Sequence, residues 1–197
     1  MQNDFTSLHM FMLQMVNLSD AAWQEMQQRL THCTYKKRDQ FVVEGKVCRE
    51  IAFVTKGSFR YYKMVDGVES TTYFSFENNW ISAYTSFLLQ APSYITIEAM
   101  EDAEAYVLRY DNLQYLYQHH TVFERFGRLI AEYLVTCFDE RMHSLLLKTP
   151  EERYLKTLND NSIYFERVPQ HYIASYLGIA PESLSRIRKR VMRKAIS

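Results

Sequence analysis

The chain has 197 residues, of which 47% are hydrophobic, so it has enough apolar material for a buried core and is not a disordered protein. Lysine and arginine together number 23, as do aspartate and glutamate, and the net charge of zero therefore excludes no class of partner. The three cysteines stand too far apart for a zinc or iron–sulfur site, so we expect reduced thiols and no metal. They are Cys33, Cys48 and Cys137.

Nothing in the sequence predicts secretion or a membrane span. The N-terminal segment lacks the basic region and long apolar run of a signal peptide. No apolar stretch reaches about 18 residues, the length at which a membrane-spanning helix becomes a candidate. We therefore expect a cytoplasmic protein without a membrane partner.

The charges are distributed unevenly along the chain. Residues 1–150 hold 14 Lys/Arg and 18 Asp/Glu, whereas residues 151–197 hold 9 Lys/Arg and 5 Asp/Glu. After Pro181 basic residues are dense and Glu182 is the only acid. A basic end on an acidic body is typical of proteins that bind a polyanion, although a solvated basic helix end gives the same pattern.

The first predicted element is a helix over residues 21–30. Apolar residues recur at helical spacing from Ala22 to Leu30, and Ser19 is placed to cap the N-terminus.

A region of strands follows, between about Thr34 and Arg109. Short runs rich in β-branched and aromatic residues recur every 8–12 residues or so, which predicts an antiparallel sandwich or barrel. The runs are 40–43, 50–55, 59–65, 68–76, 94–100 and 103–108. Asp66 and Gly67 lie between two of them and form the strongest hairpin signal in the chain. Residues 79–91 interrupt the strands and are expected to form a short helix or a functional loop.

Two helices are expected next. The first covers residues 111–118, with Asp111 placed to cap it. The second starts near Thr121 and carries five residues at near-heptad spacing, namely Phe123, Phe126, Ile130, Tyr133 and Cys137. Further apolar residues lie around this helix, so it needs two partners. One can be its own sheet domain and the other a second copy of the chain, although a helix buried within a monomer is the alternative.

Residues 149–152 mark the start of a further helix. Thr149 can cap it, Pro150 suits its first position, and the next two residues are acidic. We expect Tyr154, Leu155 and Leu158 to face inward and the domain junction to lie near residues 148–150.

Residues 169–194 carry the strongest functional signal. Pro169 and Pro181 open two helices, and Gly178 stands between them where a left-handed residue must turn the chain. The inward-facing residues are expected to be Ile173, Ala174, Leu177, Leu184, Ile187 and Val191. This spacing is typical of a DNA-binding helix-turn-helix. A structural helical hairpin with a basic end is the alternative.

The second helix would present polar side chains to DNA. Those expected to face base edges are Glu182, Ser183, Ser185, Arg186 and Lys189. Arg186 suits a guanine and Glu182 a cytosine. Those expected to meet phosphate are Arg188, Arg190, Arg193 and Lys194. Ala180 would be the cap residue of this helix, and alanine is a poor cap.

The order of elements resembles the Crp/Fnr family of bacterial transcription regulators. The marks are QFVVEGKVCREIAFVTKGSFRYY (40–62) and HYIASYLGIAPESLSRIRKR (171–190), in which Glu182 and Arg186 match the family's base-contacting residues. The resemblance implies an α+β protein, with an antiparallel β-roll (jelly roll), flanking helices, a coiled-coil homodimer helix and a winged helix-turn-helix. The expected boundaries are 1–120 for the sensor domain, 121–148 for the dimer helix and 149–197 for the DNA-binding domain. Double-stranded DNA, a second copy, RNA polymerase and a small-molecule effector are the implied partners.

One departure from the family concerns cyclic AMP. Members that bind it have a Gly-Glu pair and, about ten residues on, an Arg-Ser or Arg-Ala pair that holds the phosphate. The matching residues 79–100 contain no glycine, arginine or lysine. Because a buried phosphate without a cation or a glycine nest is costly, we do not expect cyclic AMP to bind tightly, and no cofactor is expected. Two alternatives stay open for Trp80, Ser82, Tyr84, Ser86 and Tyr94, which either line a pocket for a neutral or aromatic effector or fill the core.

The sequence also bears on two other classes of function, an enzyme and an interaction module. The chain has no GxSxG, HExxH, phosphate-loop or glycine-rich nucleotide motif, so we do not expect an enzyme. A ligand-binding or interaction module whose helical tip contacts protein would share the charge pattern. Salt-dependent affinity for DNA distinguishes the regulator from this module.

Overall fold

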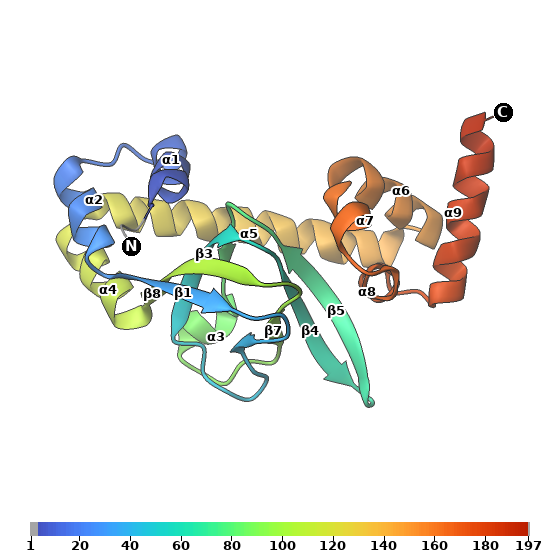
Figure 1. The fold of residues 1–197 in the computed structure, drawn as a ribbon, viewed down its shortest axis with the longest axis horizontal. Helices are drawn as coiled ribbons and strands as arrows, with labels where there is room; N and C mark the ends of the chain where they lie inside the picture. The colour runs from blue at the N-terminus through green and yellow to red at the C-terminus, as the bar shows by residue number, and fades with distance from the viewer. Residues whose placement is uncertain (1–3, 197) are drawn as a thin grey trace. The chain divides into compact units, whose positions relative to one another are not determined.

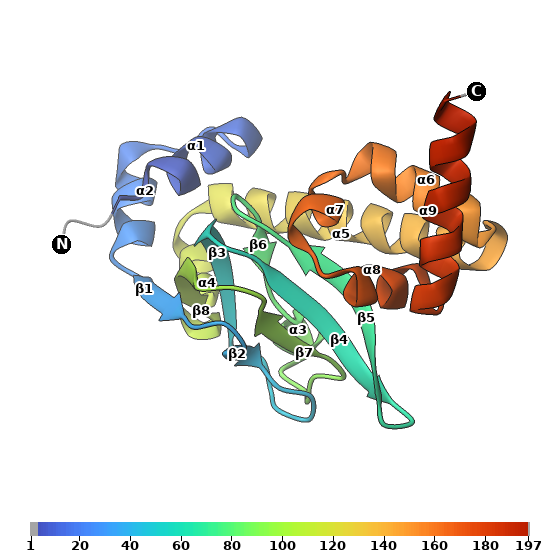
Figure 2. The same ribbon diagram turned by 45° about the vertical axis from the view of Figure 1, so that its right-hand side comes forward.

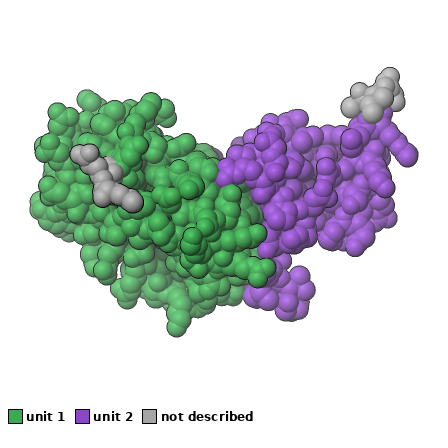
Figure 3. Space-filling view, viewed as in Figure 1, with its two compact units in different colours: residues 1–63, 74–133 green, residues 64–73, 134–197 purple. Residues whose placement is uncertain are grey.

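The computed structural model describes residues 4–196, with side chains up to Arg193, and divides into two compact units (Figure 3). Unit 1 runs to Lys63 and resumes over Phe74–Tyr133, and unit 2 comprises Met64–Tyr73 and the chain from Leu134 onward. This division differs from the expected boundaries, because it falls inside the long helix and places the tip of a β-hairpin with the C-terminal helices.

Unit 1 begins with two helices, α1 (Thr6–Met15) and α2 (Asp20–Gln27) (Figure 1). Ser19 caps α2 as predicted, with the Ala22 amide donating to the Ser19 hydroxyl oxygen at 3.3 Å. The helix ends before Leu30, which lies in β1 opposite Leu108 of β8 instead. Helical spacing alone extended the prediction too far, because sheet pairing overrides local periodicity at this residue.

The strands form two four-stranded sheets. One has the order β1 (Leu30–Tyr35), β8 (Ala103–Arg109), β3 (Glu50–Lys56) and β6 (Trp80–Ile81). The other has the order β2 (Gln40–Val42), β7 (Thr96–Ala99), β4 (Phe59–Val65) and β5 (Val68–Ser75). The pairings of β8 with β1 and β3, and of β7 with β2 and β4, are antiparallel, as predicted.

The hairpin between β4 and β5 turns at the predicted residues. Asp66 and Gly67 have φ values of 51° and 78°, so both are left-handed. Two left-handed residues in a two-residue loop match the twist of the flanking strands. The loop before β7 contains the short helix α3 (Tyr84–Leu89), in the segment where a helix or loop was expected.

One hydrophobic core joins the sheets of unit 1 to its helices. Among its fully buried residues are Met12 of α1, Phe53 of β3, Ile97 of β7 and Leu116 of α4 (Tyr110–His119). Figures 1 and 2 show α1, α2, α4 and the start of α5 (Thr121–Leu147) on the side of the β1–β8–β3 sheet. The N-cap of α4 is Arg109, and Asp111 lies in the first turn, so the prediction that Asp111 caps this helix was wrong by two positions.

Unit 2 is mainly helical, with α6 (Pro150–Asp160), α7 (Ile163–Arg167), α8 (Gln170–Leu177) and α9 (Pro181–Ile196). Thr149 and Glu152 form a capping box at the start of α6, which confirms the predicted N-terminus of this helix. Leu155, expected inside, is exposed. The expected wing is also absent from residues 134–196, all of whose regular elements are helices. Residues between α6 and α8 form α7 instead, with Tyr164 buried.

Among residues 4–196, no helix combines the length and the hydrophobicity that a membrane crossing requires.

Candidate nucleic-acid interface

Helices α8 and α9 meet at a tight turn. Gly178 caps α8 with a φ of 67°, and the Ile179 amide donates to the Ala174 carbonyl at 3.0 Å. The buried residues of the pair are Ile173, Ala174, Leu177, Leu184 and Ile187. Val191 is half-buried. The burial pattern is therefore the one that the sequence predicted for two crossed helices.

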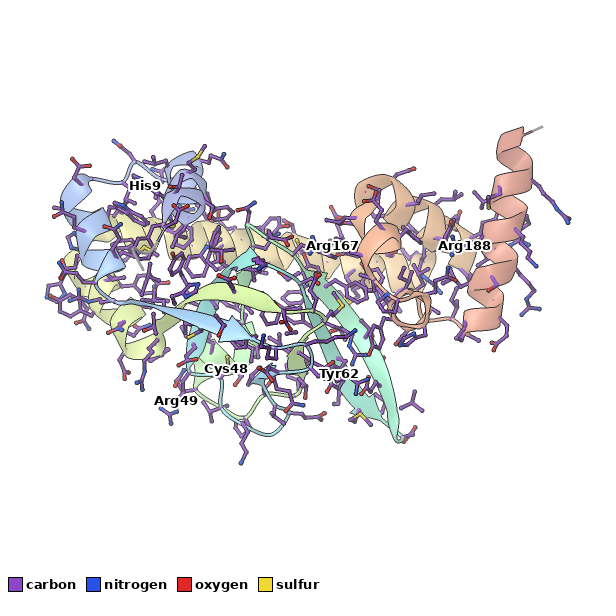
Figure 4. The ribbon with its side chains drawn as sticks, viewed as in Figure 1. His9, Cys48, Arg49, Tyr62, Arg167 and Arg188 are labelled. Carbon is purple, nitrogen blue, oxygen red and sulfur yellow. The ribbon has the colours of Figure 1, made fainter. Side chains whose placement is uncertain are left out.

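The opposite face of α9 is open. Glu182, Ser185, Arg186 and Lys189 are exposed, and Ser183 and Arg188 are half-buried. The Arg186 guanidinium donates to the Ser183 hydroxyl at 3.1 Å, so the two side chains lie together at the N-terminal end of the helix. Figure 4 shows the side chains of α9, with Arg188 labelled.

The basic residues of α9 differ in their contacts within unit 2. Arg190, which the sequence suggested for phosphate contact, forms an ion pair with Glu151 of α6 at 2.5 Å. This ion pair links α9 to α6 within unit 2. Arg193 is exposed. Arg190 therefore has a structural contact that the sequence did not reveal.

The start of α9 has no side-chain cap from the residue before Pro181. The Ala180 carbonyl accepts from the amides of Ser183 and Leu184 at 3.0 and 3.1 Å. Alanine offers no side-chain oxygen to the first-turn amides, which need acceptors.

Two arginines support the turn between α8 and α9, and the sequence reading missed both. Buried Arg153 of α6 donates through Nε to the Leu177 carbonyl at 2.9 Å and through Nη1 to the Lys148 carbonyl at 2.6 Å. Arg141 of α5 donates to the Tyr176 carbonyl, and its guanidinium carbon lies 3.9 Å from the centroid of the Tyr176 ring. Burial lowers the pKa of Arg141. The last carbonyls of α8 are thus satisfied by cations from two other helices.

Helix α8 also contacts the β4–β5 hairpin within unit 2. The Ser175 hydroxyl accepts from the Thr71 amide at 2.9 Å and donates to the Glu69 carbonyl at 3.1 Å. Because β5 is an edge strand, these two backbone groups lie on the side without a neighbouring strand. Figure 2 shows α8 beside β5.

Some apolar residues of α5 belong to the core of unit 1, and others are exposed. Of the five residues expected at a dimer interface, Phe123 and Phe126 are only 1% and 4% exposed and belong to the core of unit 1. Those two are therefore not available to a partner. Ile130 and Cys137 are half-buried and Tyr133 is exposed. The exposed apolar residues in the second half of the helix are Val135, Phe138, Met142, Leu145, Leu146 and Leu147.

The five residues proposed for an effector site do not share one environment. The Ser86 hydroxyl accepts from the Cys48 amide at 2.9 Å and donates to the Ala91 carbonyl, and the Ser82 hydroxyl donates to the Glu50 carbonyl at 3.1 Å (Cys48 in Figure 4). The bonds to Cys48 and Glu50 join the residues around α3 to the segment before β3 and to the first residue of β3.

The aromatic members of that set differ from one another. Trp80 packs against Phe53 and Phe126, with ring centroids 5.5 and 6.0 Å away. Burial raises the pKa of Tyr84, whereas Tyr94 is 52% exposed. Their arrangement favours the core-filling alternative over a single effector pocket.

Unit 1 contains a buried cation outside residues 79–100. Arg60 of β4 lies opposite Glu98 of β7, with its Nη2 3.5 Å from the Glu98 carboxylate. Its guanidinium carbon is 4.2 Å from the centroid of the Tyr62 ring. The charge of Arg60 is therefore balanced by a carboxylate of the same sheet.

The chain is similar to known proteins in part of its sequence and in its fold. Residues 32–120 match the family model described as a cyclic nucleotide-binding domain. No sequence among the curated proteins matches the chain. FixK2 from Bradyrhizobium japonicum has a similar structure, with a TM-score of 0.73, 20% identity, and coverage of 85% of this chain and 86% of FixK2.

Two further structures are similar over most of both chains. The c-di-GMP responsive global regulator CLP of Xanthomonas campestris has a TM-score of 0.70 and 16% identity, over 90% of this chain and 93% of CLP. A protein from Eubacterium rectale, described as a transcriptional regulator of the Crp/Fnr family, has a TM-score of 0.68 and 17% identity, over 90% and 85%. Residues 32–120 are therefore similar to a cyclic nucleotide-binding domain, and the chain has the same fold as these solved transcription regulators.

Proposed function

We propose that the chain is a DNA-binding transcription regulator, active as a homodimer, that reads a palindromic operator in the major groove. The observation that carries the proposal is the two-sided character of α9. Leu184 and Ile187 are buried on one side, while Glu182 and Arg186 extend into solvent on the other. A recognition helix needs this arrangement, because the side that packs against its own domain cannot also meet base edges.

The polar side of α9 has the chemistry for direct readout. Arg186 can donate two hydrogen bonds to guanine O6 and N7, and Glu182 can accept from cytosine N4. Ser183, Ser185 and Lys189 lie on the same stretch of helix. Arg188 and Arg193 contact phosphates in this proposal, which orients the helix without reading sequence.

The dimer forms through the second half of α5. Val135, Phe138, Met142 and Leu145 are separated by three, four and three positions, so they lie along one face of the helix. All four are exposed apolar side chains. A two-fold axis along this face brings two recognition helices to successive major grooves, about 34 Å apart.

The effector is a small molecule other than cyclic AMP, or none. The segment that would hold the phosphate of cyclic AMP has Ser93 and Tyr94 at the position of the Arg-Ser or Arg-Ala pair of the family members that bind it. The Ser93 hydroxyl is instead hydrogen-bonded to the backbone of Ile95. A regulator of this kind acts in the cytoplasm and contacts RNA polymerase. Its fold neighbours and its cyclic nucleotide-binding domain support a regulatory rather than an enzymatic role.

Selection of bound DNA from a random pool tests the proposal. The full-length protein is incubated with the pool at two salt concentrations, and the retained sequences are determined. A palindromic consensus, bound more weakly at high salt, is the expected result, because phosphate contacts release counterions. A pool without any enriched sequence and without salt-dependent retention would contradict DNA reading and favour a module whose helical tip contacts protein.

A further inference from the structure

A residue that precedes the predicted junction near 148–150 contacts the turn between α8 and α9. Helix α8 ends at Leu177, and the last carbonyls of a helix have no partner within it. Tyr176 receives its donor from Arg141, on α5, before the junction in the chain. Helix α5 therefore takes part in closing the turn that orients α9.

Arg141 is suited to hold this turn in one geometry. Its guanidinium both donates to the Tyr176 carbonyl and stacks on the Tyr176 ring at 3.9 Å. A planar guanidinium that bonds and stacks at once constrains distance and angle together, which a lysine ammonium does not. Arg153, Tyr164 and Tyr176 lie close enough to Arg141 to affect its pKa. Burial is the main cause of the lowered pKa of Arg141.

Other contacts between α5 and the C-terminal helices lie close to Arg141. A Cβ atom placed on Gly178 would lie 3.8 Å from Leu145 Cδ2, so the Leu145 side chain lies beside the turn. On the preceding turn of α5, the Glu140 carboxylate lies 3.7 Å from Lys156 Nζ of α6. These residues all belong to unit 2, whereas unit 1 ends at Tyr133.

We propose that Arg141 is a positioning residue for DNA reading, which fixes α8 and α9 to the second half of α5 so that the pairing of α5 sets the distance between the two recognition helices. The inference rests on the proposed function. In this proposal the part of α5 from Leu134 onward moves as one rigid unit with α8 and α9. The preferred spacing between half-sites then depends on the Arg141–Tyr176 contact.

The test compares three variants of the full chain: Arg141→Met, Arg141→Lys and, as a control, Arg128→Met. Arg128 is on the same helix and pairs with Glu132, but both side chains are more than half exposed. Affinity is measured for the selected operator and for versions with one or two base pairs inserted or removed at the centre. Circular dichroism and sedimentation confirm that each variant is folded and dimeric.

Wild type and Arg128→Met should lose at least about tenfold in affinity when the spacing changes by one base pair, because each added pair rotates and shifts the second half-site. Arg141→Met should bind the optimal operator about tenfold more weakly and should lose most of its preference for that spacing. The affinity and the spacing preference of Arg141→Lys should lie between those of wild type and those of Arg141→Met. A folded, dimeric Arg141→Met variant with the wild-type spacing profile would overturn the inference.

A second measurement distinguishes failure of the proposed DNA binding from failure of the proposed role of Arg141. If wild type binds no operator, hydrogen exchange still tests the contact. Arg141→Met should raise exchange of the Gly178 and Ile179 amides, which close the turn. Arg128→Met should leave them unchanged. Equal protection of these amides in all three proteins would overturn the role of Arg141 whether or not the chain binds DNA.

Discussion

Arg153 and Arg141 illustrate how single charged side chains stabilise the turn between α8 and α9. Arg153 satisfies the Leu177 carbonyl at the end of α8 and the Lys148 carbonyl after the end of α5. A cation near the C-terminus of a helix is also favoured by the helix dipole. The guanidinium of Arg153 donates to two carbonyls from separate segments at once, which explains how this charged side chain can be buried.

Arg186 is predicted to carry base recognition. Replacing it with alanine should relax the preference at one base pair of each half-site and should cost about 1–3 kcal/mol of binding free energy on the selected operator. The measurement is a binding titration against the operator and against operators mutated at single positions.

Arg193→Ala provides the comparison for that experiment. This residue is predicted to meet phosphate, so its loss should weaken binding evenly across sequences and reduce the salt dependence. If both variants weakened all sequences to the same extent, the division of α9 into base-reading and phosphate-contacting residues would be wrong.

At the scale of elements, the start of α9 is a local weakness. Ala180 precedes Pro181 and presents only its backbone carbonyl to the first turn. Ala180→Ser should stabilise unit 2 by about 0.5–2 kcal/mol, because a serine oxygen can accept from the amides of the first turn. Thermal unfolding followed by circular dichroism gives the measurement.

A matched change at the other end of the same turn should act in the opposite direction. Gly178 has a φ of 67°, and the neighbouring Leu145 leaves room for a Cβ atom. Gly178→Ala should therefore destabilise through backbone strain, by about 1–2 kcal/mol, rather than through a clash. For the Ala180→Ser variant, a melting temperature equal to that of wild type would show that residue 180 is not the N-cap of α9.

The start of α6 is predicted to be pH-dependent. Hydrogen bonds from the amide and hydroxyl of Thr149 hold the pKa of Glu152 below its ordinary value of 4.5. Because the folded pKa is the lower one, the stabilisation is fully present above about pH 4.5 and is lost as the pH falls through the folded pKa. Glu152→Gln, which keeps an acceptor without the charge, should melt below wild type at pH 7 and alongside it in acid. A difference in melting temperature that persisted unchanged at pH 3 or so would contradict this assignment of the pH dependence.

At the scale of the whole molecule, the exposed apolar face of α5 is predicted to hold two copies of the chain together. Phe138 and Met142 are 58% and 57% exposed, one turn apart. Covering a side chain of this size contributes about 1.5–3 kcal/mol. The double variant Phe138→Ser, Met142→Ser should therefore sediment as a monomer while keeping its helical circular dichroism.

Two comparisons make that result specific to this face. Tyr94→Ser removes another exposed aromatic side chain, and it should leave the dimer intact. Phe126→Ala should instead destabilise unit 1 by about 3–5 kcal/mol, because Phe126 is a core residue. Sedimentation of the double variant as a wild-type dimer would exclude the proposed interface.

Sequence alone determined the features that depend on residues a few positions apart. Ser19 and Thr149 cap their helices, Asp66 and Gly67 make the hairpin, and Gly178 turns the chain between α8 and α9. Each is decided by the φ preference or side-chain oxygen of one residue and by amides close to it. The strand pattern and the inward faces of the last two helices follow from periodicity for the same reason.

Only the tertiary structure decided which partner each surface has. Periodicity marked α5 as apolar, but not that Phe126 enters the core of unit 1 while Phe138 stays exposed. Nor could it place Arg141 and Arg153 inside unit 2, because the carbonyls that satisfy them come from residues distant in the chain. A buried charge is tolerated only where such partners meet it, and that meeting is a property of packing between helices rather than of local sequence.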